Sequence, residues 1–278
     1  MLQVERILTL IDPPDSARPT SAAQAALQRA TSLAAACGAR LMVMPLPHAE
    51  QASSVERSAS AETIDAFIAR TIRAQDDTLA YDVMARPTDP DALLEAISVI
   101  DPDLVVADTP TDRGPIPVLA SEPIACIARH TEVPLFVAGH QSDEEAVRRI
   151  LVPTDFSQHA RTALAHAKVL AALYNATVDV LHVLERPQYV ALNATDLLAM
   201  NDATLPERKA RRRTQTFVDS VDNASAPTRI HLDHGDAPNR IGHFVDEKAP
   251  DLVVLSTHGV IGQPSHPFGT VAEKVLRR

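Results

Sequence analysis

The sequence contains no tryptophan and few aromatic residues of any kind. Three Tyr and six Phe are spread over 278 residues, so the core must consist mainly of aliphatic side chains. So few rings also make it hard to build the platforms on which single-stranded nucleic acids stack. Lysine and arginine total 26 against 36 aspartate and glutamate, a net charge of −10, which repels phosphate backbones and anionic membranes. We therefore expect no nucleic-acid partner.

Cysteines and long apolar runs are also scarce. The two cysteines, Cys37 and Cys126, offer no disulfide framework, and both lie in apolar segments, where we expect buried small residues. No stretch approaches the ~18 apolar residues of a membrane span, and the N-terminus carries no apolar leader core. These absences favour a cytoplasmic protein with no membrane partner.

One pattern occurs twice along the chain. Residues 6–12 read Arg-Ile-Leu-Thr-Leu-Ile-Asp and residues 149–155 read Arg-Ile-Leu-Val-Pro-Thr-Asp. Further on, Asp-Pro-Asp-Leu-Val-Val at 101–106 corresponds to Ala-Pro-Asp-Leu-Val-Val at 249–254. At ~150 residues per domain the length also gives about two domains. We predict domains over residues 1–140 and 147–278, separated by a polar stretch at 140–145.

Each half alternates apolar strands with amphipathic helices. In the second half we predict strands over 150–152, 177–184, 229–232 and 252–255, the last being apolar without alternation, as in a parallel strand covered on both faces. Apolar residues recur at helical spacing from Ala160 to Tyr174, and Ser157 is placed to cap that helix. The alternation predicts an α/β fold with a doubly wound parallel sheet in each half.

The two halves end differently. The first half continues into Val-Pro-Leu-Phe-Val-Ala at 133–138, a fifth strand, whereas the second half stops at Arg278, which corresponds to His130. We therefore expect the second sheet to lack its last strand. Because an unpaired strand edge readily recruits another strand, we expect the first half or a second chain to cover it, by tight pairing of the domains or as a homodimer.

Glycines gather after the fourth strand of the second half. Three of the eight, Gly259, Gly262 and Gly269, fall within eleven residues, in a segment that reads Ser-Thr-His-Gly at 256–259, nine residues, and Gly-Thr at 269–270. Glycine lets the main chain approach a ligand closely, and amides at the start of a helix attract anions. Doubly wound sheets bind ligands at the carboxyl ends of their strands, so this segment predicts phosphate binding.

Motifs of several enzyme classes are absent. The sequence has no Gly-x-x-x-x-Gly-Lys-Ser/Thr, Gly-x-Ser-x-Gly or His-Glu-x-x-His run and no cysteine pair at zinc spacing. None of the eleven histidines is spaced as a ligand pair on an obvious helix with carboxylate support, so we predict no metal ligands. His182 is expected to be a hydrogen-bonded core residue. For the basic run at 208–213 we favour a solvated helix face over a phosphate patch, since acidic residues flank it.

The sequence resembles the universal stress protein family in its tandem form. The family's phosphate motif reads Gly-x-x-Gly, nine residues, Gly-Ser/Thr, and residues 256–270 match it except that Ser256 replaces the first glycine. Pro-Thr-Asp-Phe-Ser at 153–157 and Leu-His-Val at 181–183 are also typical of the family. The resemblance covers nearly the whole chain and implies two domains like those of adenine nucleotide α-hydrolases.

The resemblance also implies an adenine-nucleotide site in the second half. Asp155 would accept hydrogen bonds from the ribose hydroxyls, with helix capping or a turn as the alternative role, and the backbone of Val183 would meet the adenine. Main-chain amides of the glycine-containing segment would surround the phosphates. The implied binding residues are Pro153, Thr154, Asp155, Val183, Ser256, His258, Gly259, Gly269, Thr270 and Val271.

The nine residues between the glycines, 260–268, depart from the family pattern. They include two prolines and no lysine or arginine, where relatives often carry basic residues. Charge compensation for ATP would then rest on the helix start, on protonated His258 or His266, or on a divalent cation such as Mg²⁺. AMP and ADP are therefore alternative ligands.

The first half lacks the corresponding glycines. Ser256, Gly259, Gly269 and Thr270 correspond to Asp108, Thr111, Ser121 and Glu122, with Asp112 alongside. Carboxylates facing a polyphosphate repel it, so we expect this half to bind no nucleotide although it retains Asp12. The prediction is a regulatory, non-catalytic nucleotide-binding protein of the stress response. A slow ATPase or nucleotide hydrolase and a ligand-free interaction scaffold are the alternatives.

Overall fold

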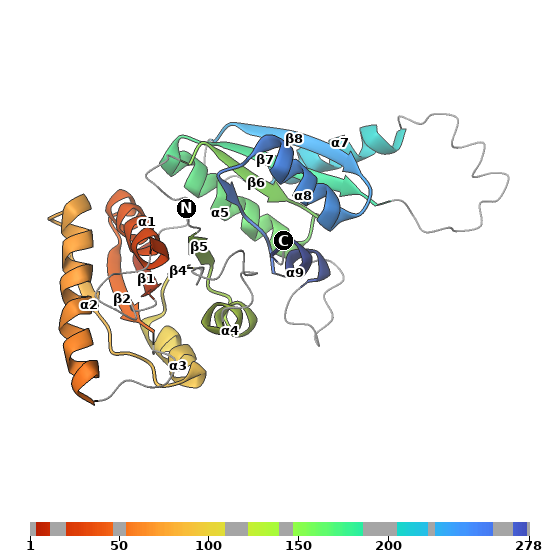
Figure 1. The fold of residues 1–278 in the computed structure, drawn as a ribbon. Helices are drawn as coiled ribbons and strands as arrows, with labels where there is room; N and C mark the ends of the chain where they lie inside the picture. Colours follow the sequence, from red (N-terminus) through yellow and green to blue (C-terminus); the bar gives the residue numbers. More distant parts are fainter. Residues whose placement is uncertain are drawn as a thin grey trace. The chain divides into compact units, whose positions relative to one another are not determined.

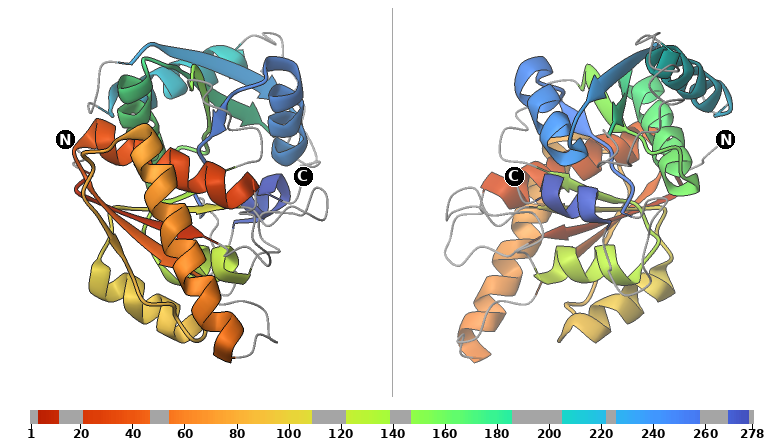
Figure 2. Two further views of the ribbon diagram at one scale, coloured as in Figure 1. Left: turned by 60° about the vertical axis from the view of Figure 1, so that its left-hand side comes forward. Right: turned by 90° about the vertical axis from the view of Figure 1, so that its right-hand side faces the viewer.

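A computed structural model of the protein describes residues 4–11, 21–46, 54–108, 122–138, 147–185, 205–221, 226–257 and 269–276. The chain divides between residues 145 and 146 into two compact units, apart from a few terminal residues. We call residues 3–145 the first unit and residues 146–276 the second unit (Figure 1). Each unit contains its own parallel β-sheet with helices on both faces (Figures 1 and 2).

The first unit holds a five-stranded parallel sheet in the order β3-β2-β1-β4-β5. The strands are β1 (Arg6–Ile11), β2 (Arg40–Pro45), β3 (Tyr81–Val83), β4 (Leu104–Asp108) and β5 (Leu135–Ala138), and the helices are α1 (Ser21–Cys37), α2 (Ser54–Gln75), α3 (Pro90–Ile100) and α4 (Glu122–His130). The order runs outward in both directions from β1, as in a doubly wound sheet. The fifth strand expected within residues 133–138 is confirmed.

The second unit repeats this plan with four strands in its described part, in the order β8-β7-β6-β9. The elements are β6 (Arg149–Pro153), α5 (Gln158–Tyr174), β7 (Thr177–Leu184), α7 (Leu205–Asp219), β8 (Thr228–His234), α8 (Ala237–Lys248), β9 (Leu252–Val253) and α9 (Thr270–Leu276). All strand pairs are parallel. The predicted α/β class is confirmed, while β9 is shorter than the expected 252–255.

Two apolar layers enclose the second sheet. On one face α5 and α7 pack against Ile150, Val152, Val178 and Val180, and on the other α8 and α9 pack against Leu151 and Leu181. The alternation along β6 explains why the strand is apolar throughout. Ser157 caps α5 as predicted, since its Oγ accepts a hydrogen bond from the Ala160 amide at 3.0 Å.

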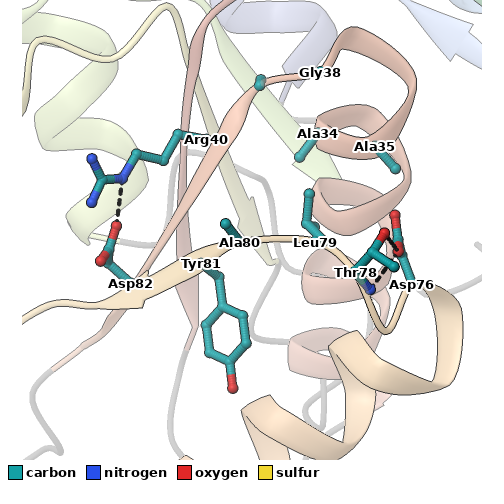
Figure 3. A pocket seen from close by; sticks show the side chains of 11 residues that line it. Ala34, Ala35, Gly38, Arg40, Asp76, Thr78, Leu79, Ala80, Tyr81 and Asp82 are labelled. Carbon is teal, nitrogen blue, oxygen red and sulfur yellow. Dashed lines mark hydrogen bonds and ion pairs between the residues drawn. The ribbon is translucent and has the colours of Figure 1, made fainter.

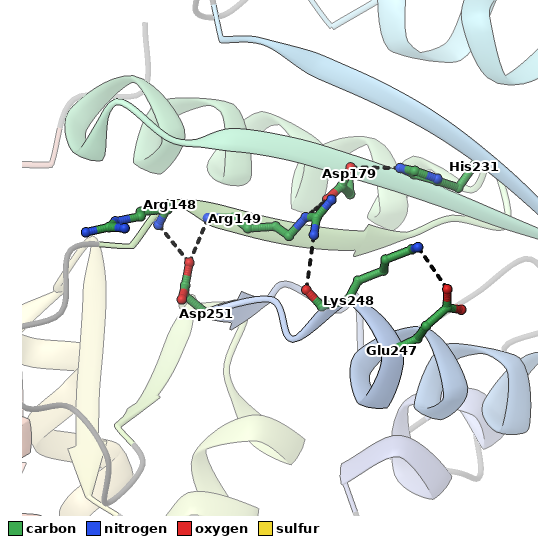
Figure 4. Close-up of polar contacts among 7 residues, drawn as sticks. All are labelled: Arg148, Arg149, Asp179, His231, Glu247, Lys248 and Asp251. Atoms are coloured by element: carbon green, nitrogen blue, oxygen red, sulfur yellow. Dashed lines mark hydrogen bonds and ion pairs between the residues drawn. The ribbon is translucent and has the colours of Figure 1, made fainter.

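The repeated Asp-Leu-Val-Val sequence has a structural role in both units. Asp251 Oδ2 accepts hydrogen bonds from the amides of Arg148 and Arg149, both at 2.8 Å (Figure 4). In the first unit Asp103 Oδ2 accepts from Glu5 and Arg6 at 2.8 and 2.9 Å. The aspartate therefore fixes the start of the central strand against its neighbour, which requires the same residue at the same place in each repeat.

The expected burial of both cysteines holds for one of them only, whereas the expected exposure of the basic run is confirmed. Cys126 is buried as expected, but Cys37 is exposed, because it is the last residue of α1 and the chain turns away at Gly38 with a φ of +68°. The basic run at 208–213 does lie on an exposed face of α7, with Ala210 alone buried.

No helix in the described part of the chain is long and apolar enough to cross a membrane.

Candidate nucleotide site

The loop after β6 is a tight turn that exposes one carboxylate. The Thr154 amide continues the ladder by donating to the Leu181 carbonyl at 2.9 Å. Thr154 Oγ1 accepts from the Phe156 amide at 3.1 Å, and Asp155 Oδ1 accepts from the Ser157 amide at 2.9 Å. Asp155 thus has the turn role that we considered as an alternative, and its side chain is also exposed at the carboxyl edge of the sheet.

Behind this loop lies a stack of rings that the sequence did not suggest. The ring centroids of Phe156 and His182 are 4.3 Å apart, and the Phe217 ring meets Phe156 edge-on at 5.6 Å. The guanidinium carbon of Arg213 lies 4.3 Å from the Phe156 centroid. We call Phe156, His182, Phe217 and Arg213 the loop stack, since it packs against the back of residues 153–157.

His182 links the loop stack to the loop backbone. Its Nδ1 lies 2.9 Å from the Thr154 carbonyl oxygen, and because a carbonyl only accepts, Nδ1 carries the hydrogen and donates. Burial lowers the pKa of the imidazole; the Thr154 bond and Asp155 oppose this shift, and the positive charge of Arg213 adds to it. The expectation of a hydrogen-bonded histidine within a strand is confirmed, but the ring is only partly buried and not in the core.

The ends of the glycine-containing segment lie together. The Gly269 amide donates to the Thr257 carbonyl at 2.6 Å, and the Glu273 amide donates to Gly269 in the first turn of α9. Thr270 opens α9 and is exposed, while Ser256 is partly buried beyond β9. His258 and Gly259 lie outside the described residues. Ser256, Gly269, Thr270 and Val271 are therefore close in space although a predicted loop separates them in sequence.

The side chains of two predicted binding residues share one cluster. Val183 and Val271 both pack against the buried group of Leu151, Leu181, Ile241 and Phe244. Since β6, β7 and β9 are parallel, their carboxyl ends lie at one edge. The loop 153–157, Val183 and the start of α9 therefore gather at the carboxyl edge of the second sheet.

The corresponding edge of the first unit is described only in part. Glu122 begins α4 as Thr270 begins α9, whereas Asp108 is the last residue of β4 and its counterpart Ser256 lies beyond the end of β9. Asp12, Thr111, Asp112 and Ser121 lie outside the described residues. The prediction that this unit binds no nucleotide therefore rests on the sequence.

The first unit contains a cavity at the opposite edge of its sheet. It measures about 520 Å³ and lies between the end of α1 and β3, with Tyr81 and the ion pair of Arg40 and Asp82 on its wall (Figure 3). A smaller cavity of about 220 Å³ lies between α7 and β8, beside Arg208 and Arg211. Neither cavity includes a predicted site residue. No group of three metal-ligating side chains occurs within the described ranges.

Comparison with known proteins identifies the family of the second unit, whose sheet has the carboxyl edge described above. The family model described as the universal stress protein family matches residues 146–278. Residues 146–278 belong to the universal stress protein family. Universal stress protein MJ0531 of Methanocaldococcus jannaschii is 26% identical over 141 residues, which are 49% of this chain and 80% of that protein.

Solved structures share the fold over both units. A universal stress protein from Archaeoglobus fulgidus matches with a TM-score of 0.71 at 15% identity, covering 99% of this chain and 96% of that chain. A protein of unknown function from Pseudomonas aeruginosa matches with a TM-score of 0.69 at 17% identity, covering 99% and 90%. The universal stress protein fold thus extends through the first unit, beyond the part matched by the family model.

Sequence reasoning missed the loop stack of this universal stress protein domain. Phe156 lies inside the Pro-Thr-Asp-Phe-Ser motif at 153–157, and Arg213 lies in the basic run at 208–213 that was predicted to be a solvated helix face. Their contact joins residues 57 positions apart in the sequence. The available signal was an aromatic residue beside the predicted ribose-binding aspartate, but its partner depends on how α7 docks.

Proposed function

We propose that the second unit binds an adenine nucleotide at the carboxyl edge of β6, β7 and β9. ATP is the first candidate, with AMP and ADP as alternatives. The observation that carries the proposal is the convergence of Asp155, Val183 and the joined ends of the segment 256–270 on one edge. Membership of the universal stress protein family supports the same site.

The backbone direction of β7 supports a role for Val183 in holding the base. In a parallel strand alternate residues direct their amide and carbonyl to the same neighbour. Thr177 and Leu181 bond toward β6, whereas Val178 and Leu184 bond toward β8. Val183 therefore directs its backbone groups toward the β6 side, beyond Pro153, where that strand has ended. An adenine ring edge has the donor and acceptor to meet both groups.

The polar ends of the ligand fit the remaining groups. A carboxylate such as Asp155 accepts two hydrogen bonds from neighbouring ribose hydroxyls. The first amides of α9 have no acceptor within the helix and suit phosphate oxygens. Mg²⁺ is a candidate companion, because the segment 260–268 lacks basic residues; with few protein ligands it would be held mainly by the phosphates.

Calorimetric titration of the full chain with ATP tests the proposal. Asp155→Asn removes the charge that strengthens the ribose hydrogen bonds and is expected to weaken binding about 10- to 100-fold. Gly269→Asp adds a carboxylate beside the phosphates and should abolish binding without unfolding the domain. Asp246→Asn, which removes an exposed charge on α8, is the matched control. If Gly269→Asp bound ATP with the affinity of the wild type, the proposed site would be wrong.

The wider role in this proposal is regulatory and non-catalytic, in a cytoplasmic stress response. The first unit would be a degenerate partner domain, and a strand from it or from a second copy would cover β9. Release of inorganic phosphate from ATP that is lost in Asp155→Asn would instead favour the slow hydrolase. Absence of binding by the wild-type chain would favour the interaction scaffold.

A further inference from the structure

We infer that Arg213 is a positioning residue for this site, and that its guanidinium, stacked on Phe156, holds the loop 153–157 in its binding conformation. The inference rests on the proposed nucleotide function. It assigns Arg213 a role in affinity although this residue belongs to another element, α7. The juxtaposition of a planar cation with a strained aromatic residue beside Asp155 carries the inference.

Phe156 adopts a backbone conformation that needs support. Its φ is +66°, in the left-handed region that side chains other than glycine and asparagine seldom occupy. Such residues persist only where the surroundings fix them, at a cost of ~1–3 kcal/mol. Here His182, Phe217 and Arg213 contact the ring. The ring contacts therefore offset the strain, and their loss would release the backbone of Phe156.

The helix that carries Arg213 is anchored firmly enough to act as this support. Lys168 of α5 is buried, and its Nζ donates to the carbonyls of Val218 and Val221 at 3.1 and 2.6 Å. Phe217 is buried as well, one helical turn after Arg213. The same face of α7 thus presents a ring and a guanidinium to Phe156, from a position fixed by the core.

A movement of Phe156 would displace both Asp155 and Val183, the predicted contacts to the ribose and the base. Phe156 follows Asp155 directly and bonds through its amide to Thr154 Oγ1. Its ring also contacts His182, which donates to the Thr154 carbonyl and directly precedes Val183. The loop stack therefore joins the predicted ribose contact on one strand to the predicted base contact on the next.

Arg213 differs in this respect from its basic neighbours. Arg208, Lys209, Arg211 and Arg212 are exposed and make no ion pair within the described part of the chain. Arg213 is exposed too, but it stacks on an aromatic face, where a planar guanidinium binds better than an ammonium group. Arg211→Gln therefore removes the same charge from the same helix without touching the loop stack.

The experiment compares Arg213→Gln, Arg213→Lys and Arg211→Gln in the full chain. The first readout is the NMR titration of the His182 ring, assigned with His182→Gln. Arg213→Gln should raise the pKa of His182, since the nearby positive charge is lost, and should speed amide exchange at Phe156 and Ser157. The second readout is ATP affinity, which should fall about 5- to 30-fold in Arg213→Gln and less in Arg213→Lys. Arg211→Gln should match the wild type in both.

The two readouts separate the inference from the proposed function. If Arg213→Gln leaves the His182 titration and amide exchange as in Arg211→Gln, Arg213 does not hold the loop and the inference is wrong. A changed loop with unchanged ATP affinity also overturns it. If the wild-type chain binds no ATP, the proposed function fails, and the loop readouts alone decide whether Arg213 positions residues 153–157.

Discussion

The two units share a backbone plan but differ in the side chains behind it. Asp103 and Asp251 fix the central strands in the same way. Arg6 and Arg149 both donate to the last residue of the helix that leads into the neighbouring strand, Ile100 of α3 and Lys248 of α8. These contacts serve main-chain groups, which every copy of the fold must satisfy. The repeat therefore retains what holds the backbone, and diverges where side chains meet one another.

The interior of the second sheet shows the divergence most clearly. Asp179 of β7 is fully buried, and its carboxylate accepts from Arg149 Nε at 2.5 Å and contacts His231 Nε2 at 2.7 Å (Figure 4). Strand register places Met42 at the position of Asp179, and Met84, the residue after β3, corresponds to His231. Both methionines pack into an apolar cluster. A buried polar network in one unit thus replaces a methionine pair in the other.

The largest difference between the two units is expected when their corresponding arginines, Arg149 and Arg6, are replaced. Arg149→Met leaves Asp179 buried beside His231 alone and should lower the free energy of unfolding by about 3 kcal/mol. Arg6→Met removes the counterpart, whose partner Asp101 is 78% exposed, and should cost less than ~1 kcal/mol. Urea unfolding of the full chain, followed by amide signals from each unit, measures both.

A third variant sharpens the same comparison. Replacing Asp179 and His231 by methionine in the Arg149→Met variant removes the buried charge and introduces the methionine pair of the first unit, and should restore most of the stability lost in Arg149→Met. Equal losses in Arg149→Met and Arg6→Met would show that the buried network adds nothing beyond the shared main-chain contacts.

A smaller effect is expected where the helices that follow the central strands differ. Lys168 of α5 corresponds to Thr31 of α1, whose Oγ1 donates within its own helix to the Leu27 carbonyl. Lys168→Met leaves the carbonyls of Val218 and Val221 without this buried donor and should cost about 2 kcal/mol. Thr31→Val should cost less than half as much. Unfolding of the two variants, followed by circular dichroism, measures both losses of stability. Equal losses would contradict this expectation.

The sequence predicted what depends on local pattern and failed where distant elements meet. The apolar strands and the cap at Ser157 follow from spacing and residue type over a few positions. The contact of Arg149 with Asp179 depends on the register of two strands, and that of Arg213 with Phe156 on how α7 docks. The prediction that Cys37 is buried was wrong for a related reason. An alanine-rich helix has no sharply defined apolar face, and the thiol is exposed because the helix ends there, before Gly38.

The weakest expected effect concerns pH and again distinguishes the units. Burial lowers the pKa values of His166 and His182, both in the second unit. The unfolded chain, with a histidine pKa of about 6.5, then binds protons more readily than the folded unit. Stability is therefore full above pH ~6.5, falls as pH drops through that value, and reaches its low level below the folded-state pKa values.

Unfolding midpoints at pH 7.5 and 5.5 measure this dependence. We expect the second unit to lose stability on acidification, and His182→Gln to lose less than the wild type because one of the two depressed groups is gone. His234→Gln, which alters an exposed histidine paired with Glu207, is the control for a general effect of removing an imidazole. An unchanged pH dependence in His182→Gln would mean that folding does not lower the pKa of His182, and that the loop stack does not oppose its protonation.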